Sequence, residues 1–302
     1  MESDRAIVTY DLSKKYPGTK KYALKNLDLD VNKGEVYGFL GPNGAGKSTT
    51  IRLLMNFIQP TAGEAKINGY DSVVESTNAK SHVGYLAGDL AIYQKMTGLA
   101  YLNYMSALQP PKRTNYYKEL SRRFKAELNR KIGELSKGNR QKIGIIQAFM
   151  HEPEILILDE PTSGLDPLMQ EEFFTLVRET KDSGASLFIS SHNLTEVQKM
   201  CDKVGFIRDG KLIAEQNISV FSEKTAIQTY DISFADKAPI EELKKLPKVK
   251  IKSNTPHHVT VRITGSLQPL FQILARQKVN SMDRRDLSLE SEFMDFYRGK
   301  KQ

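Results

Sequence analysis

The sequence predicts an α/β domain over residues 1–220, followed by a small α+β domain over residues 221–302. The first observation is that short segments rich in branched and aromatic residues alternate with helical patterns, which is typical of a layered α/β fold. The second is a continuous apolar run, Ile155–Leu158. Such a run is expected of a central parallel strand that is buried on both faces. The third is a change of pattern near residue 220, where strands and short helices of a different arrangement begin.

The elements expected in the first domain are short and bounded by turn residues. Strands are predicted at Ala6–Tyr10, Leu27–Val31, Glu35–Leu40, Glu64–Ile67, Ile155–Leu158 and Ser186–Ser190, and helices at Lys47–Ile58, over Thr97–Lys131 and at Arg140–Met150. Leu120, Phe124 and Leu128 recur at every fourth position, which predicts one apolar helix stripe. Asn68-Gly69 predicts a tight turn after the fourth strand.

The second domain is expected to follow the order β-α-β-β-α-β, which is typical of a small two-layer α+β fold. The predicted strands are Ile227–Phe234, Val249–Ser253, Val259–Thr264 and Val279–Asp283, and the predicted helices are Ile240–Leu246, Leu267–Lys278 and a closing helix at Glu290–Arg298.

Composition narrows the class of protein. The chain has 302 residues, 39% hydrophobic and 26% charged, which is ordinary for a globular protein. Its single cysteine, Cys201, excludes a disulfide within the chain. No apolar run approaches the ~20 residues of a spanning helix, and the charged N-terminus lacks the apolar stretch of a signal peptide. We therefore expect that the chain does not cross a membrane by itself.

The net charge of +8 would suit anionic lipid or nucleic acid, but without a block of five like charges an ordinary solvated surface is favoured.

A glycine-rich segment after the third predicted strand fits the pattern G-x-x-x-x-G-K-[ST]. It consists of Gly41, Pro42, Asn43, Gly44, Ala45, Gly46, Lys47 and Ser48, with Thr49 next in the chain. Its place between a strand and a helix is the context that this phosphate-binding loop, or P-loop, requires. Backbone N–H groups and the helix dipole favour phosphate, while Lys47 can reach the β- and γ-phosphates and Ser48 can bind Mg²⁺.

Two carboxylates, Asp159 and Glu160, follow the buried strand Ile155–Leu158. Ligands of open α/β sheets bind at the carboxyl ends of the strands. Asp159 is therefore predicted to hold Mg²⁺, directly or through water, and Glu160 to activate the attacking water. The alternative is a pair of helix-capping acids, which Pro161 disfavours.

Together these motifs resemble the ATP-binding cassette (ABC) family. Leu135–Asn139 (LSKGN) is similar to the family's signature loop, usually written LSGGQ. Ser163–Asp166 resembles the D-loop, His192 the switch histidine, and Tyr16 the aromatic residue that stacks on adenine. These elements fall in the family's order over about residues 5–220. The resemblance implies a P-loop fold with a mixed sheet, a helical subdomain at about residues 88–145, and ATP and Mg²⁺ as cofactors.

The resemblance also implies roles for single residues. Ser136 and Gly138 would contact the γ-phosphate of ATP bound to a second cassette, Asp166 of the D-loop would also belong to the ATP-binding residues, and His192 would donate a hydrogen bond to the γ-phosphate. Taken alone, each has a plainer interpretation: a serine cap with a glycine turn for LSKGN, a structural histidine for His192, and a strand-edge tyrosine for Tyr16. Stacking on Tyr16 would not by itself select the base.

The chain departs from the family pattern at two places. Gly88 stands where the family usually has a glutamine or glutamate, and glycine has no side chain to bind Mg²⁺ or the attacking water. Asp89, the next residue, is either a substitute or a turn residue. The signature has Lys137 and Asn139 in place of glycine and glutamine. This form, with Arg140-Gln141-Lys142, Thr162–Pro167 and the tail Leu287–Phe293, resembles ATPase subunits of bacterial drug and antibiotic exporters.

The expected partners follow from the resemblance. They are a second copy or a related ABC ATPase, packed head to tail, and a separate integral membrane permease. The chain would lie in the cytoplasm, peripheral on the inner face of the cell membrane, and would not bind nucleic acid. The alternative is a soluble, non-transport ATPase acting on ribosomes or nucleic acid. That alternative usually has two cassettes or a long coiled coil, and neither is visible between Lys47 and Ser136.

Overall fold

A computed structural model describes residues 4–90, 93–109, 112–219 and 227–285. The chain divides into two compact units, Met1–Ile218 and Ser219–Gln302.

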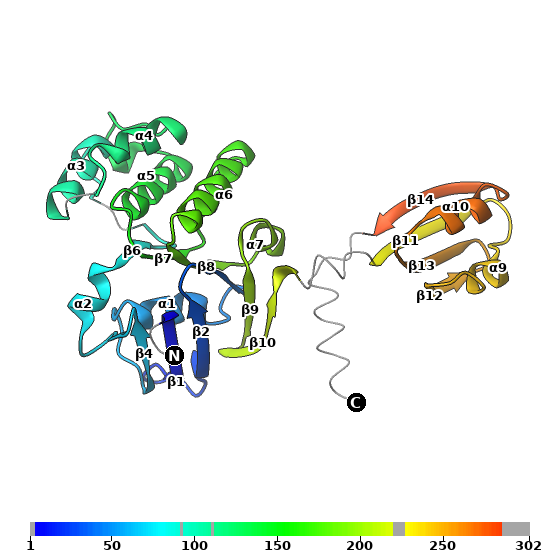
Figure 1. The fold of residues 1–302 in the computed structure, drawn as a ribbon, viewed down its shortest axis with the longest axis horizontal. Helices are drawn as coiled ribbons and strands as arrows, with labels where there is room; N and C mark the ends of the chain where they lie inside the picture. Colours follow the sequence, from blue (N-terminus) through cyan, green and yellow to red (C-terminus); the bar gives the residue numbers. More distant parts are fainter. Residues whose placement is uncertain (1–3, 91–92, 110–111, 220–226, 286–302) are drawn as a thin grey trace. The chain divides into compact units, whose positions relative to one another are not determined.

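The first unit contains two β-sheets, together with the helices described below (Figure 1). The larger has the order β10-β9-β3-β8-β7-β6, with β3, β6, β7, β8 and β9 parallel and β10 antiparallel at one edge. These strands are β3 (Val36–Leu40), β6 (Val83–Leu86), β7 (Ile155–Asp159), β8 (Ser186–Ser191), β9 (Lys203–Arg208) and β10 (Lys211–Asn217). The smaller sheet is antiparallel, in the order β2 (Leu24–Asn32), β1 (Arg5–Lys14), β4 (Ala62–Ile67) and β5 (Tyr70–Asp71). The mixed α/β fold is thus confirmed.

Strand burial explains why this sheet lies at the centre. Every residue of β3, β7 and β8 is buried, as their continuous apolar sequences predict. Because these strands are parallel neighbours, their carboxyl ends meet at one edge of the sheet. The loop after β3, the carboxylates after β7 and the segment after β8 therefore converge there.

The helices of the first unit are α1 (Lys47–Leu54), α2 (Ser76–Ser81), α3 (Gly98–Leu108), α4 (Tyr116–Arg123), α5 (Lys137–Phe149), α6 (Pro167–Asp182) and α7 (Leu194–Met200), with a 3-10 turn at Ile132–Glu134. The helices α3 and α4 pack against α5, and the three lie together at one end of the unit (Figure 1).

Helix predictions were too long in both units; in the second unit, the helices predicted at Ile240–Leu246 and Leu267–Lys278 end at Lys244 and Leu274. The segment predicted as helical over Thr97–Lys131 forms α3 and α4 instead, and α4 ends at Arg123 because Lys125 adopts a left-handed φ of 48°. Leu128 therefore lies outside the helix whose stripe it was expected to extend. Helix α1 ends at Leu54 rather than Ile58, since Asn56 has a φ of 48°. The turn at Asn68-Gly69 is confirmed, with positive φ at both residues.

The second unit contains β11 (Ile227–Phe234), α9 (Ile240–Lys244), β12 (Val249–Thr255), β13 (His258–Thr264), α10 (Gln268–Leu274) and β14 (Val279–Arg285). The order β-α-β-β-α-β is therefore present, and the sheet order is β12-β13-β11-β14 with all neighbours antiparallel. Its own core includes Ile232, Leu243, Val261 and Leu270. The predicted helix Glu290–Arg298 lies outside the described residues.

Candidate functional site

The P-loop lies between β3 and α1, and its glycines allow close approaches that a side chain would block. A Cβ atom on Gly41 would lie 2.3 Å from the carbonyl oxygen of Ile207, and Gly46 has a φ of 117°. The loop borders a cavity of about 180 Å³, which is lined by Ala23, Asn43, Gly44, Gly46, Lys47, Ser48, Thr49 and Glu160. The structure thus brings most of the predicted phosphate-binding residues to one cavity together with Glu160.

Lys47 is 6% exposed and points back into the loop. Its Nζ donates to the carbonyl oxygen of Gly41 at 2.6 Å and to that of Pro42 at 3.3 Å. It also lies 3.2 Å from Oε1 of Glu160. The ammonium group is therefore held by neutral oxygens and one carboxylate, at the place where phosphate charge would be received.

The acidic pair is fixed by the neighbouring strand β8. The Ser190 hydroxyl donates to Oδ1 of Asp159 at 2.5 Å, while the Glu160 N–H donates to Oγ of Ser190 at 3.0 Å and to its carbonyl oxygen at 3.2 Å. These bonds hold Glu160 at a φ of 48°, a left-handed conformation that is rare for a glutamate. Such conformations are found at functional sites, where the surrounding contacts impose them.

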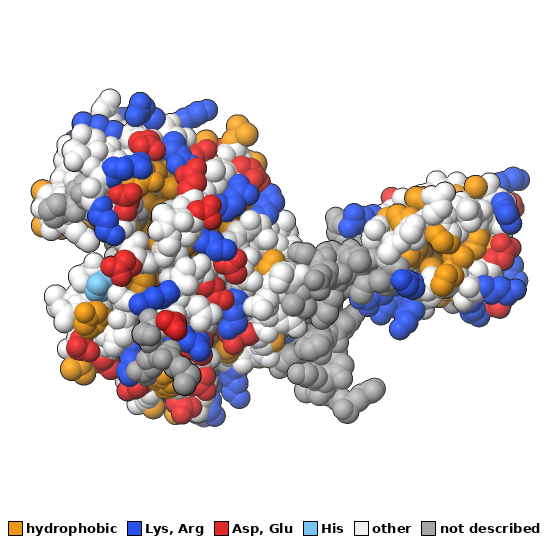
Figure 2. All heavy atoms as spheres, in the orientation of Figure 1, with side chains coloured by type: hydrophobic (Ala, Val, Ile, Leu, Met, Phe, Trp, Pro, Cys, Tyr) orange, Lys and Arg blue, Asp and Glu red, His pale blue; other side chains and the backbone are white. Residues whose placement is uncertain are grey.

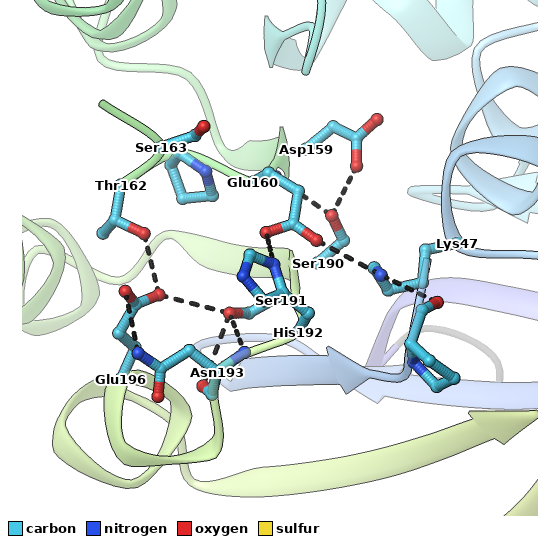
Figure 3. Close-up of polar contacts among 12 residues, drawn as sticks. Lys47, Asp159, Glu160, Thr162, Ser163, Ser190, Ser191, His192, Asn193 and Glu196 are labelled. Atoms are coloured by element: carbon cyan, nitrogen blue, oxygen red, sulfur yellow. Dashed lines mark hydrogen bonds and ion pairs between the residues drawn. The ribbon is translucent and has the colours of Figure 1, made fainter. Parts of the chain in front are cut away.

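Three elements converge on the Glu160 carboxylate (Figure 3). Lys47 comes from the start of α1, Glu160 follows β7, and His192 follows β8. Nδ1 of His192 lies 2.7 Å from Oε2 of Glu160. A carboxylate held by an imidazole on one side and an ammonium on the other can accept a proton from a water molecule placed in the cavity.

The oxygen atoms of Ser48 and Asp159 are the donors that suit a bound magnesium ion. Asp159 is buried, and Ser48 lines the cavity. Among the described residues no group of three or more His, Cys, Asp or Glu side chains could hold a metal by itself. An ion with few protein oxygens and a shell completed by phosphate oxygens and water is the coordination that Mg²⁺ prefers. The donor set therefore fits Mg²⁺.

Gly88 packs directly against Asp159, at the end of β6. A Cβ atom on Gly88 would lie 3.0 Å from Oδ2 of Asp159, so a side chain here would point at the predicted metal ligand. Asp89 instead borders a second cavity of about 260 Å³ beside the start of α5, lined by Gly88, Asp89, Leu90, Gln94, Ile132, Lys137, Arg140 and Gln141. Asp89 is not among the residues that line the cavity bordered by the P-loop.

The signature-like loop lies apart from the P-loop cavity of its own chain. Ser136 caps α5 by accepting a hydrogen bond from the Asn139 N–H at 3.2 Å. Gly138 packs so closely on Gly164 that a Cβ atom would lie 2.5 Å from the Gly164 carbonyl oxygen. Asp166 caps α6 by accepting from the Met169 N–H at 3.1 Å. Neither Ser136, Gly138 nor Asp166 lines the cavity that the P-loop borders.

Tyr16 is also outside the lining of that cavity. Its ring is partly buried, and Nζ of Lys14 lies 5.5 Å from the ring centroid. Ala23 occupies the cavity wall instead. Among the other histidines, Nδ1 of His82 lies 3.3 Å from Oε1 of Glu154, Nδ1 of His257 lies 3.1 Å from the Asp236 carbonyl oxygen, and burial lowers the pKa of His151.

Sequence reasoning missed three side chains around the site. Ser190 binds Asp159, and Gln141 donates to the Pro161 carbonyl oxygen at 2.8 Å. Glu196 accepts a hydrogen bond from Thr162 at 2.7 Å. Their partners lie 20 to 34 residues away in the chain, so no local motif indicates them.

Comparisons with known proteins identify the family. The family model described as ABC transporter matches residues 24–163. The ATP-binding protein NatA of Bacillus subtilis (strain 168), an ABC transporter component, is 35% identical over 215 residues, which are 68% of this chain and 87% of NatA. The chain belongs to the family of ABC transporter ATPases.

Further relatives agree with this assignment. The bacitracin transport ATP-binding protein BcrA of Bacillus licheniformis is 37% identical over 212 residues, 69% of each chain. A solved ATP-binding subunit of an ABC transporter matches this ABC ATPase with a TM-score of 0.66 and 28% identity, over 73% of this chain and 93% of that one. A dimeric cassette bound to ADP and Pi has the same fold, with a TM-score of 0.64 and 21% identity over 70% of this chain and 98% of that one.

Proposed function

We propose that this ABC ATPase is the energy-supplying subunit of an exporter, and that it drives a separate membrane permease for drug, antibiotic or lipid-like substrates. The observation that carries the energy-supplying role is the convergence of Lys47, Glu160 and His192 beside the P-loop. The relation to BcrA supports the substrate class, because that protein is named for bacitracin transport.

In the proposed reaction the P-loop N–H groups bind the phosphates of ATP, and Lys47 turns from Glu160 to the β- and γ-phosphates. Ser48 and Asp159 would hold Mg²⁺, which neutralises charge on the phosphate oxygens when bound. Glu160 accepts the proton of the attacking water, and His192 orients the Glu160 carboxylate and donates to the γ-phosphate. Tyr16 would stack on the adenine ring.

The signature residues are proposed to complete the site of a second cassette. Ser136, Gly138 and Asp166 lie away from their own P-loop cavity, so they are free to act in trans. ABC ATPases of this fold form dimers, as the structure with ADP and Pi does. We expect Glu160→Gln to dimerise in excess MgATP, because slow hydrolysis traps the closed state. A molecular mass by light scattering that stays monomeric would contradict this proposal.

The permease is proposed to bind at the helical subdomain, which we place at about residues 88–145. Tyr93 and Tyr104 are 58% and 43% exposed, and their rings meet edge to face with centroids 6.0 Å apart. Exposed aromatic side chains are enriched in protein interfaces. Among the described residues no helix is long and apolar enough to span a membrane. In the proposal, the separate permease provides the transport path. The chain would then lie on the inner face of the cell membrane.

Nucleic acid is not an expected partner. On the face of the first unit shown in Figure 2, acidic and basic side chains are interspersed rather than gathered into a basic stripe. Residues 1–220 are proposed as the nucleotide-binding domain and residues 221–302 as an accessory domain.

The deciding experiment is affinity purification of Glu160→Gln, trapped with MgATP, from detergent-solubilised cells of its own source, with mass spectrometry of what is retained. We expect a polytopic membrane protein. The matched control is Tyr93→Glu/Tyr104→Glu in the same background, which should lose that protein while still binding ATP. Recovery of ribosomal proteins or nucleic acid without a membrane protein would overturn the transport proposal.

A further inference from the structure

Glu196, in the first turn of α7, joins the two loops that carry the reacting residues (Figure 3). Its Oε2 accepts from the hydroxyl of Thr162 at 2.7 Å and from that of Ser191 at 3.2 Å. Its Oε1 accepts from Nδ2 of Asn193 at 3.3 Å. Thr162 follows Glu160 by two residues, and Ser191 directly precedes His192. One carboxylate thus bridges the segment after β7 and the last residue of β8.

Helix capping does not account for these contacts. Glu196 is the third residue of α7, where a glutamate commonly reaches back to the N–H of the N-cap residue. Here the N-cap is Asn193, and its N–H donates to the Ser191 hydroxyl at 2.9 Å. The Glu196 carboxylate therefore remains available to bind Thr162 and Ser191.

The surroundings of Glu196 favour a fixed geometry over a surface ion pair. Thr162 and Ser191 are 4% and 1% exposed, so without Glu196 two buried hydroxyls would lose an acceptor. No Lys, Arg or His forms an ion pair with Glu196 in the described ranges. The donors that bind Glu196 within the described part of the chain are neutral, and hydrogen bonds from such donors are directional.

We propose that Glu196 is a positioning residue for ATP hydrolysis, which sets the Glu160–His192 pair through Thr162 and Ser191. The contacts close a ring: Glu196 to Thr162, along the chain to Glu160, across the 2.7 Å contact to His192, and through Ser191 back to Glu196. On the strand side, Ser190 already ties the backbone of Glu160 to β8. Glu196 supplies the second tie beyond the pair, which limits how far the two loops can separate.

The inference rests on the proposed roles of Glu160 and His192, and a double-mutant cycle tests it on the full chain. Purified wild type, Glu196→Ala, His192→Ala and the double variant are compared for kcat and for the KM of MgATP. Since a 1 Å misplacement can cost roughly 100-fold in rate, we expect Glu196→Ala to lower kcat roughly 10- to 100-fold, with KM within about twofold of wild type. If Glu196 acts through His192, the double variant has the kcat of His192→Ala, within about twofold.

The matched control is Glu171→Ala. Glu171 on α6 pairs with Lys199 of α7 at 2.6 Å, so this variant also removes a carboxylate that anchors α7, but none that binds the loops. It should retain wild-type kcat. Glu196→Gln keeps one carbonyl acceptor and should lose less activity than Glu196→Ala. If Glu196→Ala does not fold, Thr162→Val combined with Ser191→Ala removes the two donors instead and should lower kcat in the same way.

The outcomes distinguish a failure of the positioning role of Glu196 from a failure of the proposed hydrolysis by Glu160 and His192. If Glu196→Ala matches Glu171→Ala in kcat, or if the losses of Glu196→Ala and His192→Ala multiply, the positioning role is refuted while ATP hydrolysis by Glu160 stands. If Glu160→Gln and His192→Ala both hydrolyse ATP like wild type, the proposed mechanism fails, and this inference fails with it.

Discussion

Neutralising Glu160 should strengthen nucleotide binding as well as stop hydrolysis. Glu160 is the carboxylate that pairs with Lys47, and the Glu160 and Lys47 side chains are 20% and 6% exposed. At 3.2 Å and an effective dielectric constant of about 20, their attraction is roughly 5 kcal/mol before desolvation. ATP must break this pair and bring a triphosphate close to the Glu160 carboxylate. Glu160→Gln removes both obstacles.

Only part of that attraction will be seen in the affinity. Lys47 keeps its bonds to the Gly41 and Pro42 carbonyl oxygens, and glutamine still offers Lys47 an oxygen. We expect a net gain of about 1 kcal/mol, which corresponds to roughly fivefold tighter binding.

The assay is calorimetric titration with a non-hydrolysable ATP analogue and Mg²⁺, so that turnover does not confuse the comparison. His192→Ala is the matched control, since it removes the other partner of Glu160 and leaves the charge on Glu160. Because His192 is also proposed to donate to the γ-phosphate, the affinity of this variant should not rise above that of wild type. Titrations at two protein concentrations separate this effect from dimerisation, because the gain from the broken ion pair does not depend on protein concentration. Equal or weaker binding by Glu160→Gln at low protein concentration would refute the reasoning.

Three further predictions concern close packing and burial. Gly138→Ala places a Cβ atom 2.5 Å from the Gly164 carbonyl oxygen, so we expect roughly tenfold slower ATP hydrolysis with unchanged affinity of the monomer for ADP, measured by steady-state kinetics and titration. Gly88→Ala puts a methyl group 3.0 Å from Oδ2 of Asp159. This contact should raise the Mg²⁺ concentration for half-maximal ATPase activity several-fold. An unchanged concentration would show that the Asp159 carboxylate can move away from the methyl group without loss of Mg²⁺ binding. Burial lowers the pKa of His151, so the unfolded chain binds the imidazole proton more tightly than the folded chain does. The contribution of this neutral histidine to the free energy of unfolding is therefore complete above the unfolded pKa of about 6.5, and it declines as the pH falls below that value. Thermal unfolding at pH 7.5 and 5.5 should therefore show a smaller decrease in Tm for His151→Phe than for wild type.

Features encoded in contiguous residues were predictable from the sequence. The strand, glycine-rich turn and helix that hold Lys47 follow one another in the chain, so the motif and its context could be recognised together. The same holds for the β-α-β-β-α-β order of the second unit. Helix ends were less predictable, because the left-handed residues Asn56 and Lys125 stop α1 and α4 where the apolar periodicity continues.

Contacts between distant segments could not be predicted in this way. From the neighbouring sequence alone, Glu196 would be interpreted as a helix-capping residue. Thr162 lies 34 residues away in the chain, and the parallel register of β7 and β8 brings it beside Glu196. That register also pairs Asp159 with Ser190, which fixes the Glu160 backbone in its left-handed conformation. The motifs therefore specify which groups react, whereas the sheet and the side chains behind it determine how the groups are held. For this reason Glu196 can influence turnover although it belongs to none of the motifs that the sequence displays.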